Sequence, residues 1–280
     1  MSLPFTTRPS LDSTTNKTLT TSQLRETFLI ENVFVDNTLT CTYSFYDRMI
    51  VGGAKPVDKP IMLDAPDILK ADFFLQRREI GIINVGDTGT VVADGEKFVI
   101  QNKEALYIGK DVKNVVFMPG EKGGTPLFYY NSSPAHRTYP TKKVTLEQAE
   151  TVELGTPENS NQRTVRKLLV NSILETCQLQ MGLTELKSGS VWNTMPPHTH
   201  DRRMEVYFYF NVPSNQRVCH LMGEPTETRH LWLSNNQAVI SPPWSIHAGA
   251  GTSQYAFIWG MAGENLDYSD MDIVQPIDLK

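Results

Sequence analysis

Short apolar segments, separated by polar turns, recur along most of the chain. In the first half they are spaced by roughly ten residues, a rhythm typical of sandwiches and barrels made of short strands. The candidate strands of this half are residues 79–85, 90–93, 97–100, 105–108, 114–118 and 127–130. Asp94-Gly95, between two of them, is a strong hairpin signal because both residues tolerate a left-handed backbone. Helical periodicity is scarce, so the pattern predicts an all-β protein.

The same rhythm returns after a polar stretch at residues 131–165. We interpret this stretch as the crossover between two halves, with room for a short helix near 145–151. The candidate strands of the second half are residues 166–170, 178–186, 205–210, 217–222, 229–233, 237–240 and 254–259. The shared architecture predicts two similar antiparallel β-barrels of the jelly-roll type. The expected division is an N-terminal arm at 1–24, one barrel at 25–150 and a second barrel at 151–280.

The first part of the chain is expected to be irregular. Residues 1–24 are polar and rich in Thr and Ser, which predicts an extended arm or a docking segment. Residues 24–35 are apolar, Asp36-Asn37 offers turn chemistry, and residues 38–46 alternate with the period of a half-buried strand. We expect the two apolar segments to pair as a hairpin.

Two histidines, His198 and His200, mark the most informative stretch of the chain. On a strand both imidazoles would point to one face, because side chains alternate. Glu205 has the wrong parity for the same straight strand, so residues 201–203 must turn or bulge to return it to that face. His247 lies between a Pro-Pro turn and Ala-Gly-Ala-Gly, where it can enter the mouth of a barrel. Imidazoles with a carboxylate suit a metal ion, and we predict that these four residues form one metal site.

The run that follows Glu205 alternates in the same way. Tyr207 and Tyr209 share the face of Glu205, whereas the aliphatic and phenylalanine residues between them face the packing. The two tyrosines could move protons or bind a ligand, although core packing is the more ordinary role of a buried tyrosine. The remaining histidines lack such neighbours and are expected to be structural or exposed; they are His136, His220 and His230.

Composition limits the partners and the compartment. The 280 residues are 40% hydrophobic and 20% charged, with a formal net charge of −5. This balance indicates a soluble globular protein and disfavours nucleic acid, whose binding needs clustered Lys and Arg. No apolar run is long enough for a membrane helix, and the N-terminus lacks a signal-peptide pattern. Three cysteines without a Cys-x-x-Cys pair fit a reducing compartment, so we expect a cytoplasmic protein without a membrane partner.

The spacing His198-x-His200-x4-Glu205, followed by His247, resembles the two motifs of the cupin superfamily. The glycine expected three residues before the second-motif histidine is Trp244 here, and the first half has no His-x-His. The resemblance therefore implies a bicupin in which only the C-terminal barrel holds a metal. Longer segments resemble the 5-keto-4-deoxyuronate isomerase family over nearly the full chain. They are Asp47-Arg-Met-Ile-Val-Gly-Gly53, Arg78-Glu-Ile-Gly-Ile-Ile-Asn-Val-Gly86, Ser133-Pro-Ala-His-Arg-Thr-Tyr-Pro-Thr141, residues 194–210 and Trp259-Gly-Met-Ala-Gly-Glu-Asn265.

This family resemblance implies a cofactor, an assembly and a reaction. It implies one Zn²⁺ per subunit, held by His198, His200, Glu205 and His247, in a homohexamer of the bacterial cytoplasm. The implied role is in pectin breakdown, by isomerisation of 4-deoxy-L-threo-5-hexosulose uronate to 3-deoxy-D-glycero-2,5-hexodiulosonate. Either an enediolate or a hydride shift would develop negative charge on adjacent oxygens, which a divalent metal stabilises.

The residues that move the proton and bind the substrate carboxylate are less clearly marked. Glu205, if it exchanges off the metal, and Tyr207 are the catalytic candidates. A substrate carboxylate favours a guanidinium fork. Arg203 is our substrate-binding candidate because of its parity with Glu205, and Arg202 and Arg163 are its rivals.

Three other functions stay open at this stage. A cupin dioxygenase could use iron in the same ligand set. A related isomerase could act on 5-deoxyglucuronate in inositol breakdown. A non-catalytic bicupin, such as a storage or regulatory binding protein, is disfavoured by the intact ligand set.

Overall fold

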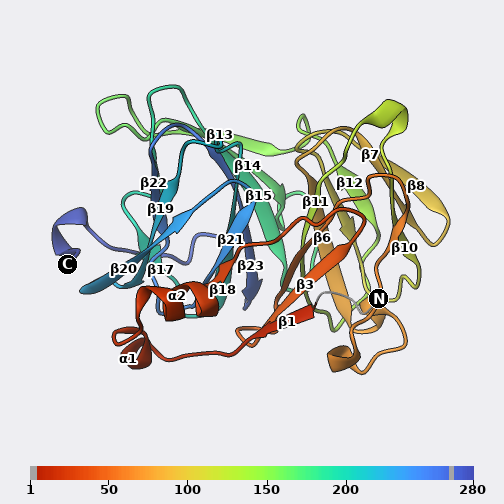
Figure 1. Cartoon of the computed structure of the whole chain (residues 1–280), viewed down its shortest axis with the longest axis horizontal. Helices are drawn as coiled ribbons and strands as arrows, with labels where there is room; N and C mark the ends of the chain where they lie inside the picture. The colour runs from red at the N-terminus through yellow and green to blue at the C-terminus, as the bar shows by residue number, and fades with distance from the viewer. Residues whose placement is uncertain (1–4, 265–267) are drawn as a thin grey trace. The chain divides into compact units, whose positions relative to one another are not determined.

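Antiparallel sheets dominate the structure, a computed structural model that describes residues 5–264 and 268–280 (Figure 1). The chain divides into two compact units. Of the described residues, the first contains 5–7, 32–150 and 168–181; the second contains 8–31, 151–167, 182–264 and 268–280. The first four residues of the predicted arm, and Asn265 at the end of a family-like segment, lie outside the described residues.

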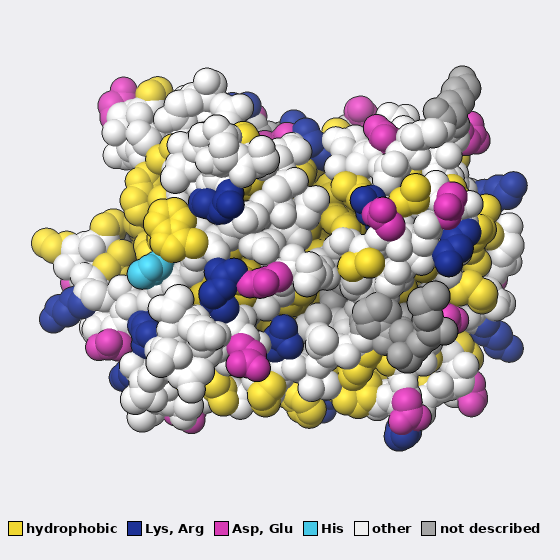
Figure 2. Space-filling model, in the orientation of Figure 1, with side chains coloured by type: hydrophobic (Ala, Val, Ile, Leu, Met, Phe, Trp, Pro, Cys, Tyr) yellow, Lys and Arg dark blue, Asp and Glu magenta, His cyan; other side chains and the backbone are white. Residues whose placement is uncertain are grey.

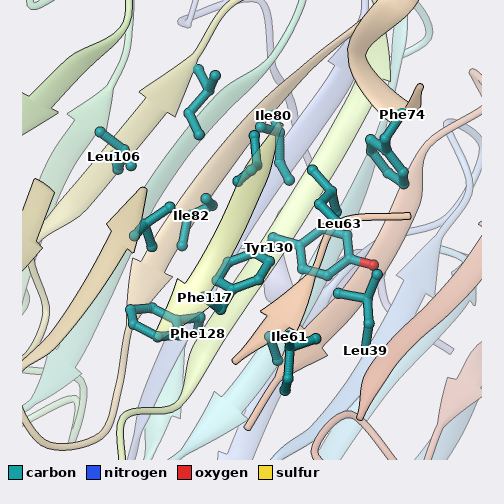
Figure 3. Close-up of a cluster of buried hydrophobic side chains, with 14 of the residues drawn as sticks. Leu39, Ile61, Leu63, Phe74, Ile80, Ile82, Leu106, Phe117, Phe128 and Tyr130 are labelled. Carbon is teal, nitrogen blue, oxygen red and sulfur yellow. The ribbon is translucent and has the colours of Figure 1, made fainter. Parts of the chain in front are cut away.

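One pair of sheets surrounds the core of the first unit. The larger sheet has the order β1 (Phe5–Arg8), β3 (Leu39–Ser44), β4 (Ile50–Ala54), β11 (Phe128–Pro134), β6 (Arg78–Asn84), β9 (Ala105–Ile108) and β12 (Lys142–Val144). The smaller sheet has the order β5 (Ile61–Met62), β10 (Val115–Met118), β7 (Gly89–Ala93) and β8 (Glu96–Ile100). Buried side chains such as Ile82, Phe117 and Tyr130 form one apolar cluster (Figure 3). The loops carry the 3-10 helices η1 (Asp67–Leu69), η2 (Phe74–Gln76) and η3 (Glu121–Gly123).

A second pair of sheets follows the same plan. The larger has the order β13 (Glu150–Leu154), β14 (Arg163–Leu169), β15 (Gln180–Leu186), β23 (Ala256–Gly263), β18 (Arg203–Phe210), β21 (Gln237–Ser241) and β2 (Leu29–Ile30). The smaller has the order β16 (Trp192–Asn193), β22 (Ala248–Gly251), β19 (Val218–Glu224) and β20 (Glu227–Leu233). Two short strands, β17 (His198–Thr199) and β24 (Asp272–Ile273), pair separately, and η4 (Pro276–Asp278) lies near the C-terminus.

The two pairs of sheets correspond strand by strand. The order β3-β4-β11-β6-β9 of the first matches β14-β15-β23-β18-β21 of the second, and β5-β10-β7-β8 matches β16-β22-β19-β20. This correspondence confirms the prediction of two similar antiparallel barrels. It also makes β6 equivalent to β18, so the loops that precede them, residues 63–77 and 194–202, are equivalent parts of the two barrels. The Asp94-Gly95 hairpin is confirmed too, with positive φ at both residues.

Short helices occupy the segment that was expected to be an arm followed by a strand. They are α1 (Ser13–Asn16) and α2 (Thr21–Phe28). The predicted hairpin of residues 24–35 with 38–46 is limited to its turn, where Val35 and Thr38 form a single antiparallel bridge. The extended pairing is wrong, because β2 pairs with β21 and β3 pairs with β4. A capping box between Thr20 and Gln23 begins α2, and the buried Leu24 and Phe28 lie one turn apart on the same face. The start of this apolar run therefore has the helical period.

The crossover also differs from the prediction. The helix considered near 145–151 is absent: residues 146–148 form a turn, Ala149 is a bend, and β13 begins at Glu150. The units depart from the expected division in two segments, since residues 8–31 belong to the second unit and residues 168–181 to the first. Pairing of β2 with β21 accounts for the first departure.

The surface carries charges of both signs. On the face drawn in Figure 2, the described acidic and basic side chains are interspersed rather than gathered by sign. None of the helices formed by the described residues is long and apolar enough to cross a membrane.

A buried carboxylate secures residues 177–179 within the first unit. Glu79 on β6 is fully buried. Its oxygens accept hydrogen bonds from the backbone amides of residues 177–179 at 2.8–2.9 Å. They also accept hydrogen bonds from the hydroxyls of Tyr107, at 2.7 Å, and Ser133, at 3.2 Å. Because oriented amide and hydroxyl donors compensate a buried charge, Glu79 is suited to a structural role.

We expect Glu79→Gln to lower the free energy of unfolding by about 3 kcal/mol, because its NH₂ group would face backbone donors and leave them unsatisfied. Urea denaturation followed by circular dichroism measures this change. Glu96→Gln, on the solvent-exposed end of β8, is the matched control and should cost less than about 0.5 kcal/mol. Equal stability of the two variants would contradict the anchoring role of Glu79.

Candidate metal centre

Three imidazoles and one carboxylate converge in the second unit. His198 Nε2 lies 3.0 Å from His247 Nε2. Glu205 Oε2 lies 3.0 Å from His200 Nε2 and 2.9 Å from His247 Nε2. Neighbouring ligands of an ion bound at about 2.1 Å are expected to lie roughly 3 Å apart. The structure therefore brings together, as a possible metal-binding group, the four residues that the sequence singled out.

A turn returns Glu205 to the face of the histidines. His200 follows β17, residues 201–202 form the turn, and β18 begins directly afterwards. The change of parity expected from the sequence is therefore produced by this turn. β17 is held in place by β24, which sets His198 opposite Ile273. Glu205 itself lies on β18 between β21 and β23, in the middle of the larger sheet.

His247 reaches the centre from a turn between the two sheets of this unit. It lies between β21 and β22, directly before the first residue of β22. The turn is closed by a hydrogen bond from Ser245 N to Pro242 O at 3.0 Å. The Ser245 hydroxyl secures it further, since it accepts from Gly223 N at 2.9 Å. His247 is completely buried, so its ring position is determined by packing as well as by the turn.

The outer nitrogens of two rings contact backbone carbonyls. His200 Nδ1 lies 3.0 Å from Arg203 O, and His247 Nδ1 lies 3.4 Å from Ser245 O. A carbonyl only accepts, so each Nδ1 carries a proton, and each Nε2 directs either its lone pair or a second proton towards the centre. Those lone pairs would repel the Glu205 carboxylate unless a proton or a metal cation lay between them. The donor set therefore fits a divalent transition metal such as zinc or iron.

The protonation of these groups follows from burial and mutual charge. Burial, and then the charge of His247, lowers the pKa of His198 to about 2. Burial by itself would raise the pKa of Glu205. The charge of His247 and the hydrogen bonds from His200 and His247 outweigh this effect and keep the pKa of Glu205 below its usual range. At neutral pH the centre thus combines a neutral His198 with an ionised Glu205, as a metal requires of its ligands.

A pocket of about 310 Å³ adjoins the four residues. His198, Glu205 and Tyr207 contribute to its lining, and apolar side chains form much of the wall; these include Phe257, Trp259, Met261 and Ile273. The Tyr207 hydroxyl is 2.8 Å from Thr194 Oγ1. Burial, and then the charge of Glu205, raises the pKa of Tyr207 well above 10, so the phenol stays protonated. An apolar pocket with a few converging polar groups is typical of a small-molecule site.

Two arginines line this pocket, but their surroundings differ. The predicted substrate ligand, Arg203, is buried, and its Nη1 lies 2.6 Å from Asp270 Oδ1. Its rival Arg163 donates to Asn161 O at 2.8 Å, and it has no carboxylate partner among the described residues. Arg202 forms ion pairs with Glu264 and Asp270 and does not line the pocket. Arg163 is therefore the guanidinium more available to an anionic ligand.

Tyr209 lies deeper than Tyr207 and contributes to packing. Its hydroxyl is 2.7 Å from Nδ1 of the buried His220, on the facing sheet. Neither of these side chains lines the pocket. His220 is thus structural, whereas His136 and His230 are exposed, as expected for the three histidines outside the metal motif.

The sequence alone did not single out Thr194 or Asp270. Thr194 hydrogen-bonds Tyr207, and Asp270 pairs with Arg203. Thr194 directly precedes Met-Pro-Pro-His in the sequence, and this nearness to the first metal-ligand candidate is the signal that could have identified it. Asp270 belongs to an acidic tail. The strand β24 of this tail has only two residues, so no periodic pattern in the sequence predicts that β24 pairs with β17.

Comparisons with known proteins relate this geometry to a family. The sequence model of the KduI/IolB family matches residues 52–275. A 4-deoxy-L-threo-5-hexosulose-uronate ketol-isomerase of Formosa agariphila is 54% identical over 280 residues, covering 100% of both chains. A Bacteroides thetaiotaomicron protein, 4-deoxy-L-threo-5-hexosulose-uronate ketol-isomerase 1, is 54% identical over 264 residues, 94% of each chain.

Solved structures with little sequence similarity share the fold. An IolB-like protein from Salmonella typhimurium superposes with a TM-score of 0.71 at 15% identity, over 88% of this chain and 96% of that one. The bicupin oxalate decarboxylase of Lactobacillus farciminis gives a TM-score of 0.55 at 9% identity, over 80% and 79%. These likenesses confirm the predicted all-β bicupin fold. The full-length sequence identity goes further: this chain belongs to the KduI/IolB family.

Proposed function

We propose that this chain is a zinc-dependent 4-deoxy-L-threo-5-hexosulose-uronate ketol-isomerase. The observation that carries the proposal is one pocket lined by His198, Glu205 and Arg163, whose guanidinium has no carboxylate partner among the described residues. A uronate has a carbonyl end and a carboxylate end, and this pocket offers complementary groups for both. Relatives with that activity, 54% identical over the full chain, support the same assignment.

The four donors would hold the metal through their inward-facing Nε2 and carboxylate atoms. When bound, a divalent ion supplies stabilisation for the negative charge that develops on adjacent substrate oxygens. Arg203 O and Ser245 O keep two of the rings in the required tautomer through Nδ1. These contacts orient the ligands before the substrate binds.

Isomerisation removes a proton from C2 of the substrate and returns a proton to C1, while the hydroxyl proton moves between the two oxygens. Glu205 is the one carboxylate among the described residues that line the pocket. It is therefore our candidate for holding the carbon-derived proton, in a state in which it has exchanged off the metal. Tyr207, whose phenol stays protonated, is placed to donate a hydrogen bond to a substrate oxygen. Its contact with Thr194 orients the hydroxyl for that role.

The other end of the substrate would lie against Arg163. A guanidinium can bind a carboxylate through two parallel hydrogen bonds, which fixes both position and orientation. Burial lowers the pKa of Arg163. Such a group gains more from an anionic partner than a solvated arginine does. Arg203, by contrast, is neutralised by Asp270 and serves to hold the pocket wall.

Two alternatives remain distinguishable by experiment. The family also includes IolB-type proteins, so turnover of 5-deoxyglucuronate should be measured beside that of the hexosulose uronate. Iron could occupy the same donor set in an oxygen-dependent enzyme. Chelation followed by addition of zinc without oxygen should restore isomerase activity, and a strict need for iron and oxygen would contradict the zinc assignment.

The family resemblance also suggests a homohexamer in the cytoplasm. Sedimentation velocity of the purified protein would test the hexameric assembly.

We expect His247→Ala to lose the bound metal and at least about 10²-fold in kcat/KM while it keeps the β-sheet spectrum. Metal analysis of the purified protein and circular dichroism measure the two effects separately. His230→Ala, an exposed histidine on β20, is the matched control and should keep both metal and activity. Stoichiometric metal with normal turnover in His247→Ala would rule out this ligand assignment.

We expect Arg163→Gln to raise KM for the uronate tenfold or more, with metal content unchanged, because a charge-assisted pair contributes about 1.5–3 kcal/mol. Initial-rate kinetics give the measurement. Arg166→Gln is the matched control, since Arg166 lies on the same strand, pairs with Glu185 and does not line the pocket. An unchanged KM in Arg163→Gln would show that the substrate carboxylate does not bind Arg163.

A further inference from the structure

The first unit has a pocket of its own at the place that corresponds to the metal-binding mouth. Its volume is about 230 Å³, and residues of loop 63–77 form much of its lining. That loop joins β5 to β6, as residues 194–202 join β16 to β18 in the second barrel. Three of the family-like segments quoted above contribute to it, through Arg48, Arg78 and Pro134. The function proposed for the metal centre uses none of these residues.

The lining of this pocket is cationic. Arg48, Arg77 and Arg78 all contribute to it, and none of its described lining residues is Asp or Glu. The remaining wall is largely apolar and includes Ile68 and Phe74. Three guanidinium groups beside an apolar surface match a small molecule that has an anionic head and a compact body.

Arg78 is the buried member of the three. It is 6% exposed, and its acceptors among the described residues are uncharged: Ser132 Oγ at 3.1 Å, Ser132 O at 2.7 Å and Arg48 O at 2.6 Å. Burial lowers its pKa to about 10, so the group stays charged at neutral pH. A buried charge is costly unless an opposite charge compensates it.

The equivalent arginine of the second barrel does have such a partner. Arg203 is the first residue of β18, as Arg78 is the first residue of β6. Both stand opposite the end of the neighbouring strand, Arg203 beside Gly263 and Arg78 beside Pro134. Arg203 is paired with a carboxylate at 2.6 Å, whereas Arg78 has no ion pair within the described part of the chain. Among the described residues, the first barrel therefore has no counter-charge where the second has one.

Arg48 is presented to the pocket by a strained turn. Asp47 and Arg48 have φ of 45° and 52°, in the left-handed region that disfavours most residues with a side chain. The turn joins β3 to β4 and is closed by a hydrogen bond from Met49 N to Tyr46 O at 3.1 Å. The presence of Arg rather than Gly or Asn at such a position points to a use for the guanidinium, because strain of this kind often marks a binding site.

We propose that this pocket of the metal-free barrel binds a small metabolite through an oxyanion, either a carboxylate or a phosphoryl group. The anion lies between Arg48 and Arg78 and compensates the charge of the buried guanidinium. Arg77 is held at the rim by the carbonyls of Leu69 and Lys70 and adds a third positive charge. The ligand body rests on the apolar wall formed by loop 63–77.

The test is a calorimetric titration of the full-length protein with inorganic phosphate, D-galacturonate and D-galactose. The two anions distinguish a phosphoryl from a carboxylate head, and galactose is the neutral counterpart of the sugar acid. The same titrations in His247→Ala remove any contribution from the metal centre. We expect at least one anion to bind in both proteins, and galactose to bind in neither.

Arg48→Asn removes the guanidinium and suits the left-handed backbone, so the turn should be preserved. It should weaken anion binding at least tenfold, and Arg77→Gln should weaken it to a smaller extent. Arg137→Gln is the matched control, because Arg137 is an exposed arginine of the same unit outside the pocket. Failure of both anions to bind, or equal binding by wild type and Arg48→Asn, would overturn the proposal. Neither result would bear on the isomerase assignment, which depends on the other barrel.

Discussion

The buried negative charge of Glu205 is the constraint around which the second barrel is organised. An isolated carboxylate cannot stay ionised in an apolar interior, so positive or proton-donating groups must surround it. Here the surrounding groups are His200 and His247, both within 3.0 Å. Each ring is oriented from outside by a carbonyl, and each comes from a different segment of the chain. The turn before β18, the loop before β22 and the pairing of β17 with β24 all serve to bring these segments together.

The two barrels solve the same problem of buried charge in different ways. In the first, backbone amides and hydroxyls donate hydrogen bonds to Glu79 and compensate its negative charge. These described partners direct no lone pair at the carboxylate that could bind a metal, so Glu79 serves as a structural anchor. In the second, Glu205 is compensated by imidazoles, whose lone pairs can also hold a metal. The arginines at the start of the central strands show the same contrast. Arg203 is neutralised within its own barrel, whereas Arg78 has no ion pair with any residue that the structure describes.

This contrast explains how one topology can carry two kinds of site. Equivalent loops lead into equivalent strands, so each barrel has a pocket near the start of its central strand. The chemistry of each pocket depends on which side chains the preceding loop supplies. Loop 194–202 supplies histidines and a threonine hydroxyl, whereas loop 63–77 supplies Arg77 and apolar side chains. The proposed isomerase activity and the proposed anion site thus result from local sequence placed on a shared framework.

The sequence by itself determined the strand rhythm, the two-barrel plan and the set of metal-ligand candidates. Alternation along a strand depends only on neighbouring residues, and the parity of His198, His200 and Glu205 already required a turn at 201–203. The sequence was a poorer guide to the N-terminal segment. There the capping box and the Leu24–Phe28 spacing favour a helix, whereas the apolar run that begins at Leu24 resembles a strand. Only the tertiary structure decided which arginine is available to a ligand. That choice depends on Asp270 reaching Arg203 while no carboxylate of residues 5–264 and 268–280 reaches Arg163. Contacts between residues so distant in sequence leave no periodic trace along the chain.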